Sequence, residues 1–166
     1  MSDHRPTTEP ASRVFVYGTL KCGYHNHSRL CREHAGSLAG FVRGRVVDRP
    51  EGFPTLFVPV DDVLAAGSDD LRADCRLIET LDQNSYDMAA IPSREPWHFV
   101  AGEVYTFRDG AERLQTLDML EDYIPGEPSM YCRVALPVRT SHGVVPCWAY
   151  ISPHSARFQA EHASQP

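Results

Sequence analysis

Several short stretches of the chain are rich in β-branched and aromatic residues and are bounded by Gly, Pro, Asn or Asp. Such stretches, either apolar throughout or alternating with polar residues, are typical of β-strands. Glycines within the second stretch predict a bend or a bulge, and the proline in the third suits a strand start or a sheet edge. We expect strands at 14–17, 35–48, 52–58, 100–107, 131–138 and 144–151.

Three further segments are predicted to be helices. The first follows Asn26 and the third follows Asp109, and both of these residues are good N-caps. The second has apolar residues at helical spacing, and neither glycine nor proline interrupts the third. The expected helices cover 27–34, 71–81 and 111–122.

One face of the third predicted helix carries two leucines and two acids, namely Leu114, Leu117, Asp118 and Glu121. Glu121 continues the leucine stripe and lies near the helix C-terminus, where the helix dipole disfavours negative charge. Burial and the dipole would both raise the pKa of this carboxyl, which suits a group that accepts and returns a proton near neutral pH. The alternative, which the pattern alone favours, places Glu121 at a wet boundary of the stripe.

The first predicted strand runs into a segment with glycines at 18 and 23, ahead of the helix that follows Asn26. Glycine lets successive N–H groups turn into one cavity, and a helix N-terminus adds partial positive charge, so such a loop can bind an anion. The spacing fits neither a Walker loop nor a dinucleotide-binding fingerprint. From spacing alone, an ordinary strand followed by a tight turn is the favoured interpretation.

Composition limits the class of protein. The 166 residues suffice for one domain, which we expect at 13–152, with polar flexible segments at 1–12 and 153–166. A net charge of −6 argues against a general nucleic-acid binder, and no apolar run approaches the length of a membrane span. Five cysteines without a CxxC pair favour reduced thiols in a cytoplasmic protein rather than disulfides or a zinc site.

The segment 61–97 has the least regular pattern. It begins with several aspartates, contains the predicted helix 71–81, and continues as a loop. We treat it as an insertion in the domain. Long segments of this kind are either lids and binding loops or tolerated surface elaborations, and the sequence leaves both open.

Five segments in the same order resemble the γ-glutamylcyclotransferase-like superfamily, which includes γ-glutamylamine cyclotransferase and the AIG2-like proteins. Together they span about residues 14–151, apart from the segment 61–97. They are Tyr17-Gly18-Thr19-Leu20 with Gly23 and Asn26-His27, Gly52-Phe53-Pro54-x-Leu56, Gly102-Glu103-Val104-Tyr105, Leu117-Asp118-x-x-Glu121-x-Tyr123, and Tyr131-x-Arg133.

The resemblance implies an α+β fold, with a small mixed β-barrel and helices packed against it. It also implies a cofactor-independent enzyme of the lyase or acyltransferase type, which releases 5-oxoproline and a free amine from a γ-glutamyl compound. In such a reaction the substrate's own α-amine attacks the γ-carbonyl, with Glu121 as general acid/base. The substrate-binding residues would be Tyr17, Gly18, Thr19, Leu20 and Tyr131.

The same resemblance implies a small-molecule γ-glutamyl substrate and no metal, nucleic-acid or membrane partner, and we expect a monomer or a weak dimer. A non-catalytic protein that binds γ-glutamyl ligands is the alternative function. Several nearby residues have two interpretations each. Tyr131 contacts substrate or is a core tyrosine, and Asp118 is more plausibly structural than a tuner of Glu121. Glu103 is a second active-site acid or a solvated surface charge, and Arg133 binds the substrate carboxylate or is a surface charge; surface charge is the preferred interpretation of both. His25, His27 and Cys22 are interpreted as loop residues, neither metal ligands nor a nucleophile.

Overall fold

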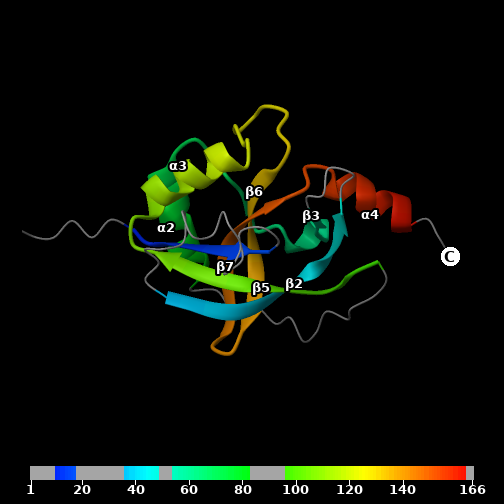
Figure 1. The fold of residues 1–166 in the computed structure, drawn as a ribbon, viewed down its shortest axis with the longest axis horizontal. Coiled ribbons are helices and arrows are strands. Elements are labelled where there is room, and N and C mark those ends of the chain that lie inside the picture. Colours follow the sequence, from blue (N-terminus) through cyan, green and yellow to red (C-terminus); the bar gives the residue numbers. More distant parts are fainter. Residues whose placement is uncertain (1–9, 18–35, 49–53, 83–95, 164–166) are drawn as a thin grey trace, which may run out of the picture.

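The structure is a computed structural model, and it describes residues 10–17, 36–48, 54–82 and 96–163. Within these residues the chain forms strands, helices and one short 3₁₀ turn (Figure 1). In chain order they are β1 (Ser12–Val16), β2 (Gly36–Asp48), β3 (Pro54–Phe57), η2 (Val60–Asp62), β4 (Ala65–Ala66), α2 (Leu71–Leu81), β5 (His98–Phe107), α3 (Gly110–Leu120), β6 (Cys132–Thr140), β7 (Gly143–Ile151) and α4 (Ser155–Ala163).

The strands form one mixed sheet in the order β3-β2-β5-β1-β7-β6-β4. A pairing between β2 and β6, at Phe41 and Arg139, closes five of these strands into a barrel. Strand β1 lies between β5, to which it is antiparallel, and β7, to which it is parallel at Val14 and Trp148. The barrel therefore joins the first described strand to the last one, and the α+β fold with a small mixed barrel is confirmed.

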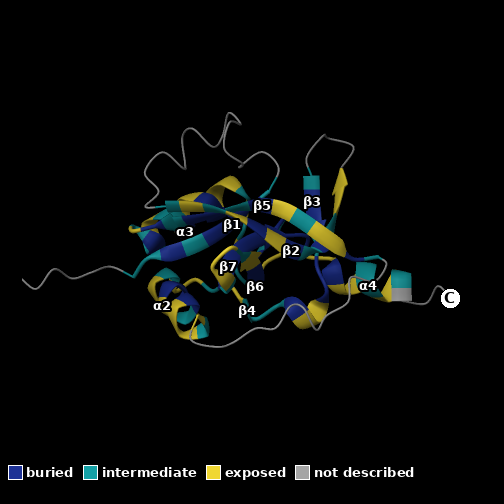
Figure 2. Cartoon of the chain, turned by 90° about the horizontal axis from the view of Figure 1, so that it is seen from below, coloured by how far each residue is buried: buried dark blue, intermediate teal, exposed yellow. Residues whose placement is uncertain are grey.

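Alternate residues of the strands face two different cores, as the period of two requires. On β1, Phe15 faces the interior of the barrel with Val104 and Leu136, while Val14 and Val16 face helices α2 and α3 on the outside. These helices pack against each other and against β1 and β7 (Figure 1). Along β2 and β5, buried residues also alternate in part with more exposed ones (Figure 2).

The predicted strands and the helices at 71–81 and 111–122 are confirmed to within a few residues. Helix α3 ends at Leu120, so Glu121 is its C-cap rather than a residue of its last turn. Asp109 is at the N-cap position as predicted, but within the described residues its carboxylate caps no first-turn N–H and pairs with Arg113 at 3.3 Å instead. The predicted helix 27–34 lies outside the described residues.

Much of the segment 61–97 is part of the fold. Strand β4 pairs with β6, and α2 places Cys75 and Ile78 in the core shared with α3. Asp70 caps α2 by accepting a hydrogen bond from the Ala73 N–H at 3.1 Å. Neither alternative, a lid or a surface elaboration, describes residues 65–81, because their removal would open the core. Residues 83–95 lie outside the described part, so a lid there stays a prediction.

The expectation of a flexible tail after residue 152 is wrong as far as residue 163, because helix α4 packs on β3, on η2 and on Trp97. Phe158 stacks on Phe57 with ring centroids 4.4 Å apart, and the Gln159 side chain accepts a hydrogen bond from the Val60 N–H at 2.8 Å. Ser155 is buried and accepts from the Val58 N–H. In the part of the chain that the structure describes, no helix is long and apolar enough to cross a membrane.

Candidate active site

Glu121 lies in a well-defined cap at the C-terminal end of α3. Its N–H donates to the Leu117 carbonyl at 2.9 Å, and the next residue, Asp122, is left-handed with φ 52°. The Tyr123 N–H then donates to the Asp118 carbonyl at 2.8 Å, and the Asp122 N–H donates to Met119 at 3.3 Å. This pair of bonds is the Schellman arrangement, with aspartate at the position where glycine is usual. The cap fixes the backbone on both sides of Glu121.

The Glu121 side chain is partly buried, and burial raises the pKa of its carboxyl to about 7. Its charge is close enough to Tyr150 on β7 to contribute to the raised pKa of that phenol, although burial is the main cause. A carboxyl with a pKa near 7 can both accept and return a proton at neutral pH. Partial burial with this direction of the pKa shift favours the interior position of Glu121 over the wet-boundary alternative.

Arg133 is fully buried, with 0% of its surface exposed, so its interpretation as a surface charge is wrong. Its Nε donates to Asp118 Oδ1 at 2.8 Å, and its Nη1 donates to Asp74 Oδ2 at 3.0 Å. A further bond from Nη2 reaches the Ser68 carbonyl at 3.1 Å, and the guanidinium lies 4.7 Å from the ring centroid of Trp148. These contacts occupy the guanidinium inside the protein, so we do not assign it to a substrate carboxylate.

Asp118 is the acid that Arg133 pairs with, which agrees with the preferred structural interpretation. It also accepts a hydrogen bond from the Tyr150 hydroxyl at 2.6 Å. The places of Tyr150 and Asp74 beside Asp118 and Arg133 were not predicted from the sequence. Signals existed for each: Asp74 falls between Leu71 and Ile78 on the apolar stripe of α2, and Tyr150 alternates with apolar neighbours on β7.

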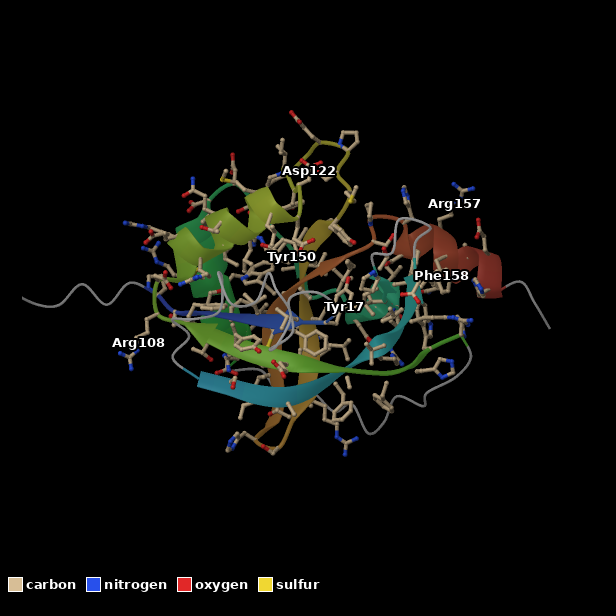
Figure 3. All side chains as sticks on the ribbon, viewed as in Figure 1. Tyr17, Arg108, Asp122, Tyr150, Arg157 and Phe158 are labelled. Carbon is tan, nitrogen blue, oxygen red and sulfur yellow. The ribbon has the colours of Figure 1, made fainter. Side chains whose placement is uncertain are left out.

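Tyr17 joins the end of β1 to two neighbouring strands. Its hydroxyl donates to the Tyr150 carbonyl at 2.6 Å and accepts from the Leu56 N–H at 3.1 Å. Figure 3 shows Tyr17 and Tyr150 together with Asp122 at the end of α3. The structure thus brings Tyr17 and the Glu121 turn to the same residue, Tyr150. The predicted binding residues Gly18, Thr19 and Leu20, and the loop residues Cys22, His25 and His27, lie outside the described residues.

Two other candidates are less exposed than a binding residue or a surface charge would be. Tyr131 is buried just before β6, and its hydroxyl donates to the Pro54 carbonyl at 3.2 Å, which supports the core alternative. Glu103 is partly buried and accepts a hydrogen bond from the hydroxyl of Tyr105, a core residue. The interpretation of Glu103 as a solvated surface charge is therefore wrong.

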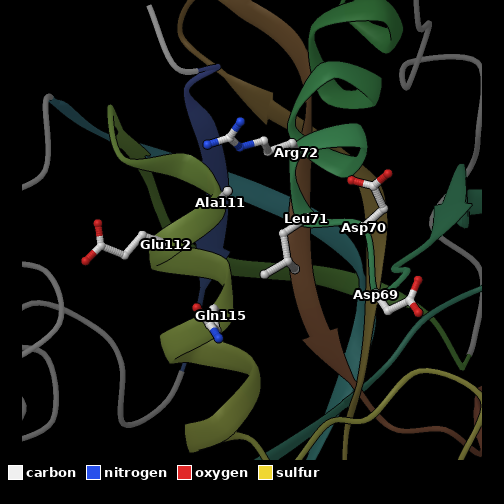
Figure 4. Close-up of a pocket in the computed structure, with 7 residues that line it drawn as sticks. All are labelled: Asp69, Asp70, Leu71, Arg72, Ala111, Glu112 and Gln115. Carbon is white, nitrogen blue, oxygen red and sulfur yellow. The ribbon is translucent and has the colours of Figure 1, made fainter.

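A wide-open hollow of about 590 Å³ lies between the N-terminal ends of α2 and α3 (Figure 4). Its lining is polar and largely acidic, and Glu112 and Gln115 are the residues that α3 contributes beyond Ala111. Glu121 lies nine residues after Glu112, about 13 Å along the helix axis at 1.5 Å per residue. We therefore do not assign this hollow to the chemistry of Glu121.

The sequence and the fold of this chain are both similar to those of known proteins. The sequence model of the family described as gamma-glutamyl cyclotransferase, AIG2-like, matches residues 14–87 and 64–165. A curated γ-glutamylaminecyclotransferase from Rattus norvegicus is 32% identical over 128 residues, which are 77% of this chain and 64% of the relative. The chain thus spans a little under two thirds of that relative's length.

Solved structures give the same fold. The crystal structure of an AIG2-like protein from Mus musculus superimposes with a TM-score of 0.51 and 25% identity, covering 94% of this chain and 84% of that one. YkqA from Bacillus subtilis shows the same fold at a TM-score of 0.51 and 17% identity, covering 86% of this chain and 36% of its own. Because the family model matches most of the chain, the chain belongs to the AIG2-like gamma-glutamyl cyclotransferase family.

Proposed function

We propose that this protein is a γ-glutamyl cyclotransferase that converts a γ-glutamyl compound into 5-oxoproline and a free amine. The observation that carries the proposal is Glu121, a partly buried carboxyl held in the cap of α3, whose burial raises its pKa to about 7. Its charge acts on Tyr150, the residue whose backbone carbonyl accepts from the Tyr17 hydroxyl. Membership of the family and the activity in the name of the rat relative support the same reaction.

In the proposed reaction the substrate supplies its own nucleophile. The α-nitrogen bonds to the γ-carbonyl carbon, closing a five-membered ring, and the bond from that carbon to the leaving nitrogen breaks. Two protons move from the α-nitrogen to the leaving nitrogen, and Glu121 carries them one at a time as base and then as acid. Atoms and charge balance without a redox step, so the proposed reaction is independent of a cofactor.

Most of the barrier reduction would come from positioning and electrostatics. Ring closure is already intramolecular in the free substrate, so the protein's share of positioning is to hold the near-attack geometry. A preorganised oxyanion donor contributes about 3 kcal/mol. We assign the oxyanion or α-carboxylate contacts to the backbone amides of Gly18, Thr19 and Leu20, with Tyr17 as the anchor of that loop. We further propose a cytoplasmic protein that acts as a monomer or a weak dimer.

The test is an assay for 5-oxoproline with a panel of γ-glutamyl amino acids and γ-glutamyl amines, including one on a lysine side chain. The wild-type protein should release 5-oxoproline from at least one member. Glu121→Gln should reduce kcat by roughly 100-fold or more with little change in substrate binding, because the amide cannot accept a proton. Glu112→Gln, on the exposed side of the same helix, is the matched control and should keep wild-type turnover.

The non-catalytic alternative gives a different result. A protein that only binds γ-glutamyl ligands would show saturable binding by calorimetry, no 5-oxoproline from any member of the panel, and no difference between wild type and Glu121→Gln beyond binding. An active Glu121→Gln variant, within a few-fold of wild type, would show that another group transfers the proton.

A further inference from the structure

The α3 turn that carries Glu121 is attached to a buried group of ionic and hydrogen-bonded residues that the proposed chemistry does not use. We propose that Asp74, Asp118, Arg133 and Tyr150, which we call the positioning cluster, hold the Glu121 carboxyl in place relative to the Tyr17 end of β1. Its catalytic meaning rests on the proposed function, but the geometric claim does not.

Asp118 is the anchor on the helix. Its carboxylate accepts three hydrogen bonds, from Arg133 Nε at 2.8 Å, Arg133 Nη2 at 3.2 Å and the Tyr150 hydroxyl at 2.6 Å. Its backbone carbonyl accepts the Tyr123 N–H that closes the cap around Glu121. Side chain and backbone of one residue thus connect the Glu121 turn to β6 and β7, and displacement of Asp118 would displace Glu121.

The other side of the cap is attached to the segment before α2. The Tyr123 hydroxyl donates to the Gly67 carbonyl at 2.7 Å. The next residue, Ser68, donates to Asp74 through its N–H at 2.8 Å and its hydroxyl at 2.7 Å, and its carbonyl accepts from Arg133. Residues 67–74 therefore hold Arg133 and Tyr123 together, so the Glu121 turn is anchored both before and after the glutamate.

Tyr150 connects this cluster to the other proposed part of the site. Its hydroxyl donates to Asp118, while its backbone carbonyl accepts from the Tyr17 hydroxyl. A single residue of β7 therefore binds both the Tyr17 end of β1 and the helix residue that anchors the Glu121 turn. The position of Glu121 relative to Tyr17 then depends on Tyr150 and on the residues that hold it.

The charges support a positioning role over a purely stabilising one. A buried ion pair gives little net stability compared with apolar packing, whereas its bidentate hydrogen bonds have fixed directions. Within the described residues, the charged and titratable groups that interact here are Asp118 on α3, Tyr123 in the cap, Cys132 and Arg133 on β6, Tyr150 on β7, and Asp74 and Cys75 on α2. Arg133 is the cation that pairs with both buried carboxylates, those of Asp74 and Asp118, and its guanidinium fork sets the geometry.

Arg133→Lys is the sharpest test, because it keeps the positive charge and removes the fork. Loss of the fork should loosen the α3 cap and admit water, so the pKa of Glu121, raised by burial, should fall toward its ordinary value. That pKa is measured by NMR on protein with ¹³C-labelled glutamate carboxyls, with Glu121→Gln to assign the signal. In the same variant kcat should fall roughly 10- to 100-fold, with KM changed less than about threefold.

Arg43→Lys is the matched control. Arg43 also holds a carboxylate bidentately, that of Asp62, at 3.0 and 2.7 Å, and both side chains are largely buried. Its pair joins β2 to η2 and includes no residue of the positioning cluster. Arg43→Lys should lower the unfolding temperature while leaving the Glu121 pKa and kcat unchanged. Both variants are measured well below their unfolding temperatures.

Tyr150→Phe covers the case in which Arg133→Lys does not fold, since it removes a single hydroxyl. It should move the Glu121 pKa and kcat in the same direction by a smaller amount. An unchanged Glu121 pKa and an unchanged kcat in the folded variants, with only the unfolding temperature lowered, would overturn the positioning role. If the wild type releases no 5-oxoproline, the proposed function fails, and the Glu121 titration alone still decides whether the cluster positions the carboxyl.

Discussion

The raised pKa of Glu121 implies a stability effect that can be measured without any substrate. Burial lifts this pKa from 4.5 to about 7, so the folded protein binds a proton there that the unfolded chain has released between these values. The stabilisation from protonated Glu121 is fully present below pH 4.5 and is lost as the pH rises through 7. At 1.36 kcal/mol per pKa unit, the difference between pH 5 and pH 8 is about 2.5 kcal/mol.

Glu121→Gln removes the titrating proton while keeping the shape of the side chain. Relative to wild type, the variant should gain about 2.5 kcal/mol in free energy of unfolding on going from pH 5 to pH 8. The assay is urea unfolding at half-unit pH steps, with the difference between the two proteins plotted against pH. Glu112→Gln on the same helix controls for the effect of an exposed amide. A difference that is flat from pH 5 to pH 8 would refute the buried, proton-binding carboxyl.

Two other predictions concern the backbone around the site. Asp122 has φ 52°, a conformation that aspartate tolerates and β-branched residues do not. Asp122→Val should therefore lower the free energy of unfolding by about 1–3 kcal/mol, while Asp122→Gly should be near neutral. Thermal unfolding of both variants checks this, and equal losses would contradict it. A Cβ on Gly102 would lie 2.4 Å from the Phe15 ring and the Val16 carbonyl, so Gly102→Ala should lower the free energy of unfolding by about 1–3 kcal/mol in denaturant unfolding. Gly36→Ala is the control and should show no comparable loss, because a Cβ on Gly36 would meet open space.

The regular elements were largely predictable because their signals are local. Strand alternation, the glycine and proline breaks, and the stripe of α3 depend on neighbouring residues only, and the structure places those elements within a few residues of the prediction. Glu121 is a candidate from sequence because an acid continues the leucine stripe and because it matches a family segment, and its catalytic role stays a prediction. The tail at 153–163 was misjudged because α4 is stabilised by Phe57 and Val60, which are about a hundred residues away in sequence.

The charges were harder to interpret from sequence, because the partner of a buried ion decides its role. Arg133 resembles an ordinary surface residue until Asp118 and Asp74, from two different helices, are seen to enclose it. Pairings at a sequence separation of 59 residues leave no local pattern beyond a charged residue on a buried face. The barrel closure could not be predicted from sequence for the same reason. No local feature of β2 or of β6 indicates that they pair at Phe41 and Arg139.

The place of β1 between β5 and β7 has a consequence for how the protein is made. Of the described strands β1 is the first to emerge, yet both of its neighbours lie at least 80 residues further along, so its pairing must wait until those strands have been synthesised. Contacts of such high order slow folding and keep apolar strand edges exposed in the meantime. Tyr150 arrives with β7, the last strand. A ribosome-bound chain that ends before β7 already contains Glu121, but its carboxyl would remain an ordinary solvated acid until the final strand closes the barrel.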